Sequence, residues 1–111
     1  MTRDVPEADW RVFRELREVA RERFCRRAFE SLDRLRVDDA GSCHDRWIGL
    51  QQWLEERDTE MTAAFGDLRR STMTLRLSTI VALDLLHPDE LERFTPGTRA
   101  AVASIVRDIR D

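Results

Sequence analysis

The sequence predicts an all-α protein: a four-helix up-down bundle with two long N-terminal helices, a buried third helix, a short helical turn and a C-terminal helix. Apolar residues recur every three or four positions over long stretches, and turn-forming residues gather at only a few points. A content of 41% hydrophobic and 37% charged residues is typical of folded helical proteins. At 111 residues, the chain is expected to form a single helical domain over residues 1–111.

The first helix is expected to begin near Pro6, with Asp4 as a capping residue ahead of it, and to end near Arg36. Its apolar stripe has a mean spacing of about 3.7 residues, which favours a straight helix over a left-handed coiled coil. The stripe consists of Phe13, Leu16, Ala20, Phe24, Ala28, Leu32 and Leu35.

The second helix is expected to begin at Cys43, after a turn over residues 37–41. Ser42 stands three residues before Asp45, as in a capping box. Its apolar positions have a nearly strict spacing of about 3.5 residues, which suits packing against an antiparallel helix. They are Trp47, Leu50, Leu54, Met61, Ala64 or Phe65, and Leu68.

The third helix is predicted over residues 67–86, where apolar residues lie on every side, so that it should be the most buried element. The segment from His87 to Glu90 ends it, and Pro88 to Phe94 should form a short helical turn. Pro96 then opens the last helix.

Two helices of about 30 residues would each extend roughly 45 Å, far beyond the radius of about 13 Å expected for a compact chain of this size. If the first hairpin projects, the shorter helices are too short to cover its whole apolar stripe. A homodimer built on the first two helices would bury the remainder. The predicted face for a second copy or another protein consists of Phe13, Leu16, Leu50 and Leu54.

Charge disfavours nucleic acid and anionic membranes as partners. The net charge is −3, made up of 0 over residues 1–39, −4 over 40–68 and +1 over 69–111. No segment resembles a targeting peptide or a membrane span, so a cytoplasmic location is expected, with Cys25 and Cys43 as free thiols. All 19 basic residues are arginine, which indicates a GC-rich, bacterial-type genome rather than a special use of guanidinium groups.

One charged position interrupts the apolar pattern of the second helix. Arg57 or Asp58 stands where the period requires an apolar residue, so one of them is expected to face a neighbouring helix with a partner charge. This pair would fix the register of the helices or belong to a ligand site. The candidate partners are arginines on the first and third helices: Arg26, Arg27, Arg69, Arg70 and Arg76.

Three other groups of residues could in principle bind metal or DNA, but structural roles explain them better. The carboxylates of the second helix, at Glu55, Glu56, Asp58 and Glu60, lack the Glu-x-x-His pairs of helical metal sites. Cys25, Cys43, His44 and His87 lack the spacing of zinc motifs. A DNA-reading helix from Pro96 would carry the arginines Arg99, Arg107 and Arg110.

No catalytic or nucleotide-binding signature is present in the sequence, and no cofactor is expected. We therefore predict a helical protein-interaction module, a homodimer that binds a protein partner rather than an enzyme. The alternative is a small metal- or ligand-binding protein that uses the carboxylates of the second helix. A DNA-binding regulator ranks third.

Overall fold

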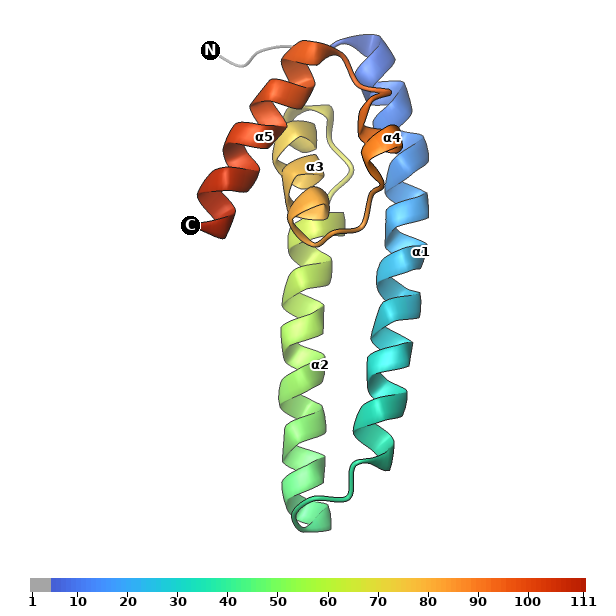
Figure 1. Cartoon of the computed structure of the whole chain (residues 1–111), viewed down its shortest axis with the longest axis vertical. Helices are drawn as coiled ribbons and strands as arrows, with labels where there is room; N and C mark the ends of the chain where they lie inside the picture. Colours follow the sequence, from blue (N-terminus) through green and yellow to red (C-terminus); the bar gives the residue numbers. More distant parts are fainter. Residues whose placement is uncertain (1–4) are drawn as a thin grey trace.

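The structure, a computed structural model, describes residues 5–111, and over this range the chain is all-α (Figure 1), as predicted. The predicted cap Asp4 lies outside the described residues. The elements are α1 (Glu7–Val37), α2 (Cys43–Phe65), the 3₁₀ turn η1 (Arg70–Thr72), α3 (Met73–Ala82), α4 (Pro88–Leu91) and α5 (Pro96–Arg110).

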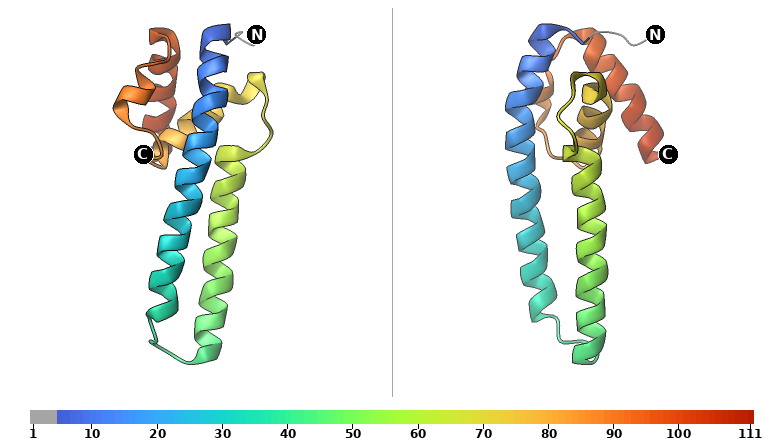
Figure 2. Two further views of the ribbon diagram at one scale, coloured as in Figure 1. Left: turned by 90° about the vertical axis from the view of Figure 1, so that its right-hand side faces the viewer. Right: turned by 180° about the vertical axis from the view of Figure 1, so that it is seen from behind.

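The first two helices form a long antiparallel hairpin, and the remainder of the chain forms a head at one end of it (Figures 1 and 2). We call residues 66–111 the head. The molecule measures 52 × 27 × 25 Å and has a radius of gyration of 16.6 Å, so the hairpin projects well beyond the head. This arrangement differs from the predicted four-helix up-down bundle, because α3 packs across the open end of the hairpin and α5 packs on α3.

The α2 helix begins where the sequence predicts. The Ser42 hydroxyl accepts a hydrogen bond from the Asp45 backbone N at 3.0 Å, and the Ser42 backbone N donates to the Asp45 carboxylate at 3.4 Å. This capping box satisfies amide groups that have no partner within the helix. Its other end comes earlier than Leu68, because α2 stops at Phe65 and Gly66 takes an extended conformation.

The predicted third helix over residues 67–86 is wrong at both ends. Residues 67–69 are not helical, and α3 covers only Met73–Ala82. At its C-terminus, Asp84 has a φ of 58°, its backbone N donates to Val81 O at 2.9 Å, and Leu85 N donates to Ile80 O at 3.2 Å. These two bonds form a Schellman motif, which ordinarily has glycine at the left-handed position. The sequence shows no such stop signal here.

The hydrophobic core lies in the head and the adjoining turns of the hairpin. It is built around α3, as the apolar character of this segment predicts. The buried apolar residues are Phe13, Leu16, Ala20, Phe24, Ala64, Phe65, Met73, Leu77, Ile80, Leu85, Phe94, Val102 and Val106. The buried part of α1 therefore ends at Phe24, and that of α2 begins at Ala64.

Candidate protein interface

The part of the hairpin beyond the head lacks a core of its own. We call residues 25–37 and 43–63 the distal hairpin. Within it, no residue of either helix is buried, although both helices keep their apolar stripes. Phe29 is 67% exposed, Trp47 58% and Leu54 57%. Large apolar side chains gathered on one uncovered surface mark a site for association.

Three of the exposed apolar side chains, Phe29, Trp47 and Leu54, lie on one face of the distal hairpin, whereas Val37 and Ile48 line no hollow of that face. Two adjoining hollows between α1 and α2, of about 320 and 210 Å³, share Leu32 in their walls. Residues spaced three, four or seven positions apart lie on one side of a helix, so both hollows open on the same side. We call this surface the apolar face; it consists of Cys25, Phe29, Leu32, Trp47, Leu50, Leu54 and Met61.

The opposite face of the distal hairpin is more polar than the apolar face. A hollow on that side is lined by Arg27, Ser31, Arg57 and Glu60, and also by Phe24, Ala28 and Leu83, the last of which follows α3. The head therefore approaches the hairpin from the polar side. No residue of the head lines either hollow of the apolar face.

Two of the four residues predicted for the dimer face lie in the core of a single chain, and for these two the prediction is wrong. Leu50 and Leu54 do lie on the apolar face, Leu50 half-buried and Leu54 exposed. Phe13 and Leu16, in contrast, are only 2% and 3% exposed and belong to the core. The reason is that the head covers the first half of α1, so these two side chains are satisfied within one chain.

Arg57 and Asp58 do not form a buried pair between helices. Asp58 is exposed, which corrects the expectation that its carboxylate could be buried. Arg57 is half-buried and lies over the Trp53 ring at 5.7 Å. Its Nε is 2.6 Å from Glu60 Oε1, at an angle that makes an ion pair but not a hydrogen bond. Both contacts are within α2 and add little to holding the two helices in register.

The arginines proposed as partners of this position are dispersed. Arg69 forms an ion pair with Asp67 at 3.0 Å. Arg70 Nη1 is 2.6 Å from Glu7 Oε2, and its Nη2 donates to Val5 O at 2.6 Å. Of the predicted set, Arg57 and Asp58 line one hollow, of about 210 Å³, and Asp58 and Arg76 line another, an open one of about 580 Å³. The five residues therefore do not make one ligand site.

Several arginines instead bind the backbone carbonyls at helix ends. Arg76 Nη1 donates to Thr62 O at 3.1 Å and to Ala63 O at 2.7 Å. Arg17 Nη2 donates to Phe65 O at 2.9 Å. The last carbonyls of a helix have no partner within it and carry partial negative charge, so a guanidinium is a favourable donor there.

The end of α3 is held in the same way from α1. Arg27 donates to Leu83 O at 2.8 Å and to Asp84 O at 2.9 Å. Arg23 donates to Leu85 O at 3.0 Å and contacts both carboxylate oxygens of Glu90, at 2.6 and 3.1 Å. The Arg23 guanidinium lowers the pKa of the Glu90 carboxyl, and the His87 backbone N contributes to the same shift. Sequence reasoning missed these roles, because on α1 these arginines resemble an ordinary solvated face.

The two cysteines are free thiols, Cys25 half-buried and Cys43 exposed. Among residues 5–111, no three His, Cys, Asp or Glu side chains lie close enough to share a metal ion. Within the same range, no helix combines the length and the apolar character that crossing a membrane requires. Comparison with protein-family models, curated proteins and solved structures gives no match to this chain.

Proposed function

We propose that the protein is a homodimeric interaction module whose two distal hairpins pack apolar face against apolar face. The observation that carries this proposal is the absence of any buried residue in the described helical positions 25–37 and 43–63. A helix in a protein gains most of its stability from packing its apolar face. A second copy supplies that packing.

Covering the side chains of the apolar face would stabilise the protein. Fully burying a large apolar side chain stabilises by about 1.5–3 kcal/mol, so covering the exposed part of Phe29, Trp47 or Leu54 contributes about 1–2 kcal/mol each. Two hairpins packed in this way make a four-helix bundle. The predicted bundle would then arise between chains rather than within one.

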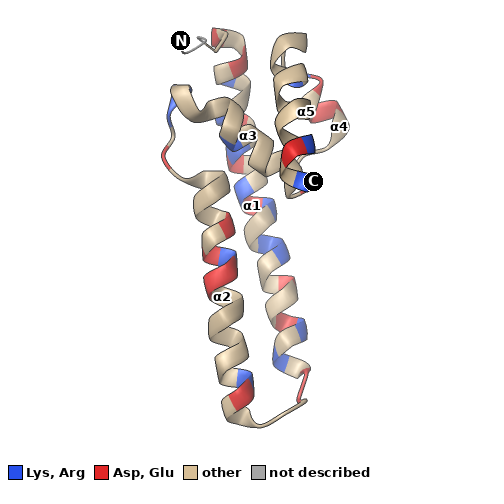
Figure 3. Ribbon diagram, turned by 90° about the vertical axis from the view of Figure 1, so that its left-hand side faces the viewer, with Lys and Arg blue, Asp and Glu red and all other residues tan. Residues whose placement is uncertain are grey.

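Charge favours one arrangement of the two hairpins. Residues 25–37 contain four arginines and two acids, a balance of +2, whereas residues 43–63 contain two arginines and five acids, a balance of −3. The acidic residues of α2 and the arginines of α1 are visible along the two helices (Figure 3). A two-fold axis along the hairpin sets α1 of one protomer beside α2 of its partner. We therefore favour this arrangement, with both heads at the same end.

A dimer of this kind leaves the heads and the polar faces free to bind another protein. A cytoplasmic location suits it, because free thiols such as Cys25 and Cys43 are typical of a reducing compartment.

The experiment that tests the proposal compares two charge substitutions on opposite faces of α2. Leu54→Asp places a charge on the apolar face, and Gln52→Asp places the same charge at a nearby exposed position outside the hollows of that face. Light scattering should give a monomer for Leu54→Asp and a dimer for Gln52→Asp, with the far-ultraviolet circular dichroism retained in both. A Leu54→Asp protein that stays dimeric would contradict the proposal.

A further inference from the structure

Two exposed side chains of opposite charge, Arg26 of α1 and Asp58 of α2, lie at the outer edges of the apolar face. Among residues 5–111, neither forms an ion pair or a side-chain hydrogen bond. The next residue of α1, Arg27, shows the contrast, because its guanidinium donates to the carbonyls of Leu83 and Asp84. Arg26 and Asp58 are therefore both available to a second chain.

Asp58 lies where the apolar face meets the outer side of α2. It lines the hollow of about 210 Å³ on the apolar face and also the open hollow on the outer side, which Arg76 shares. The Arg76 guanidinium is engaged with the carbonyls of Thr62 and Ala63. The Asp58 carboxylate thus stands free at the border of the apolar face.

Arg26 lies at the corresponding border on α1. Ala28 lines a hollow on each side of the hairpin, so it points toward α2. Residues two positions apart in a helix are rotated by about 200° from each other, so Arg26 points away from α2. It also adjoins Cys25 and Phe29, which belong to the apolar face, and it therefore forms the outer border of that face.

The two side chains stand at the same level along the hairpin. Asp58 lines its hollow together with Cys25 and Phe29, the residues on either side of Arg26 along the apolar face. Rotation about a two-fold axis along the hairpin keeps each residue of the partner at the level that it has in its own chain. With α1 of one protomer beside α2 of its partner, Arg26 comes next to the partner's Asp58.

We propose that Arg26 and the partner's Asp58 form an ion pair, twice in each dimer, and that this pair selects a second copy with its head at the same end. The inference rests on the proposed dimer. Net charge alone does not choose this contact, because the outer edge of α1 carries both signs, at Glu22, Arg26, Asp33 and Arg36. Position along the helix chooses it. Ion pairs beside an apolar seam set partner choice and orientation in helical assemblies.

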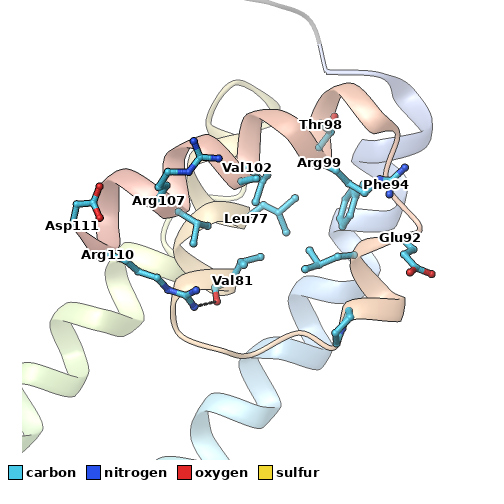
Figure 4. Close-up of a pocket in the computed structure, with 14 residues that line it drawn as sticks. Leu77, Val81, Glu92, Phe94, Thr98, Arg99, Val102, Arg107, Arg110 and Asp111 are labelled. Carbon is cyan, nitrogen blue, oxygen red and sulfur yellow. Dashed lines mark hydrogen bonds between the residues drawn. The ribbon is translucent and has the colours of Figure 1, made fainter.

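The charged groups of the head offer no comparable choice. A hollow of the head lies between α3, α4 and α5 and has an apolar floor (Figure 4). Arg99 and Arg107 line it together with Glu92 and Asp111, so charges of both signs surround it. Charge therefore selects a partner at the edge of the hairpin and not at this hollow.

The test exchanges the two charges between two variants. Arg26→Asp brings two acids together in each pair, and Asp58→Arg brings two arginines together. Each variant homodimer should therefore dissociate roughly tenfold more readily than the unaltered dimer. A dimer that contains one copy of each variant has one unaltered pair and one reversed pair, so its stability should equal that of the unaltered dimer.

Native mass spectrometry measures the share of mixed dimers when isotope-labelled Arg26→Asp protein is combined with unlabelled Asp58→Arg protein. About nine-tenths of the dimers should be mixed, against about half for labelled and unlabelled copies of the unaltered protein. Glu56→Arg is the matched control, since it makes the same charge change two residues from Asp58, at an exposed position outside the hollows described above. Combined with Arg26→Asp, it should give about half.

The possible outcomes separate this inference from the proposed function. A mixed share of about half for Arg26→Asp with Asp58→Arg would overturn the ion pair and leave the dimer standing. An unaltered protein that is monomeric would overturn the dimer and the ion pair together. Circular dichroism of each variant should match that of the unaltered protein, because both positions are exposed.

Discussion

The carboxylate of Asp9, near the start of α1, accepts hydrogen bonds from both the backbone N and the hydroxyl of Thr95, at 2.9 and 2.6 Å. Thr98 adds a third, at 2.5 Å, and Asp9 is fully buried. Thr95 and Thr98 stand at the N-terminus of α5, where amide groups lack partners within the helix. Asp9 therefore caps the last helix from the first.

This cap should make the stability of the protein depend on pH in the acidic range. Burial raises the pKa of Asp9, but the hydrogen bonds from Thr95 and Thr98 outweigh it, so the pKa is lowered overall. A lowered pKa contributes stability above the unfolded value of about 4, and this contribution disappears as pH falls through the folded value. Urea unfolding should show Asp9→Asn losing less stability than the unaltered protein between about pH 5 and pH 2. The exposed Asp33→Asn serves as control, and equal losses in all three proteins would refute the role of Asp9.

Replacing Asp84 with glycine should stabilise the protein by about 0.5–1 kcal/mol, because its φ of 58° is costly for a residue with a Cβ. The substitution also removes the Arg110–Asp84 ion pair, but both side chains are largely exposed and such pairs contribute little. Asp84→Ala keeps the strain and loses the pair, so it should not stabilise. Thermal unfolding of both variants measures this difference. An increase in stability with alanine equal to that with glycine would rule out the backbone explanation.

Replacing Gly66 and Gly49 with alanine should change the stability of the protein in opposite directions. A Cβ at Gly66 would lie 2.7 Å from Thr62 O and 2.9 Å from Arg76 Nη2, so Gly66→Ala should destabilise by about 1–3 kcal/mol. A Cβ added at Gly49 would meet nothing within 4 Å apart from its chain neighbours and the backbone of its own helix, so Gly49→Ala should stabilise α2 by up to about 1 kcal/mol. Denaturant unfolding measures both. If Gly66→Ala were neutral, the close approach of Arg76 to the end of α2 would be disproved.

The orientation of the two hairpins should be readable from a spin label on Cys43, with Cys25 changed to Ser. Cys43 is exposed at the tip of the hairpin. With both heads at the same end, the two tips are neighbours, and the labels should be about 10–25 Å apart. With the heads at opposite ends, about 20 residues of helix separate the labels, so the distance would exceed about 30 Å. The longer distance would exclude the arrangement that charge favours.

The sequence predicted the hairpin well because its signals are local. The stripe of α1 and the Ser42–Asp45 capping box fix the ends of α1 and the start of α2, and both lie where the structure has them. The end of α3 escaped prediction because aspartate, not glycine, stands at the left-handed position.

The covering of the first half of α1 was also beyond sequence reasoning. Phe13 and Leu16 belong to the same stripe as Ala28 and Leu32, and nothing in the spacing tells the two halves apart. What separates them is the tertiary placement of the head. The sites at helix ends depend on the same placement, since Arg23 and Arg27 are 62 and 56 residues from the carbonyls of Leu85 and Leu83 that they bind.

The most direct test of the central claim is the mass of the unaltered protein in solution, measured by light scattering on a size-exclusion column over a range of concentrations, with and without a chelator. The uncovered apolar face predicts a dimer of about twice the 13.1 kDa of one chain, unaffected by the chelator. A monomer at every concentration would contradict the proposal that a second copy covers the distal hairpin.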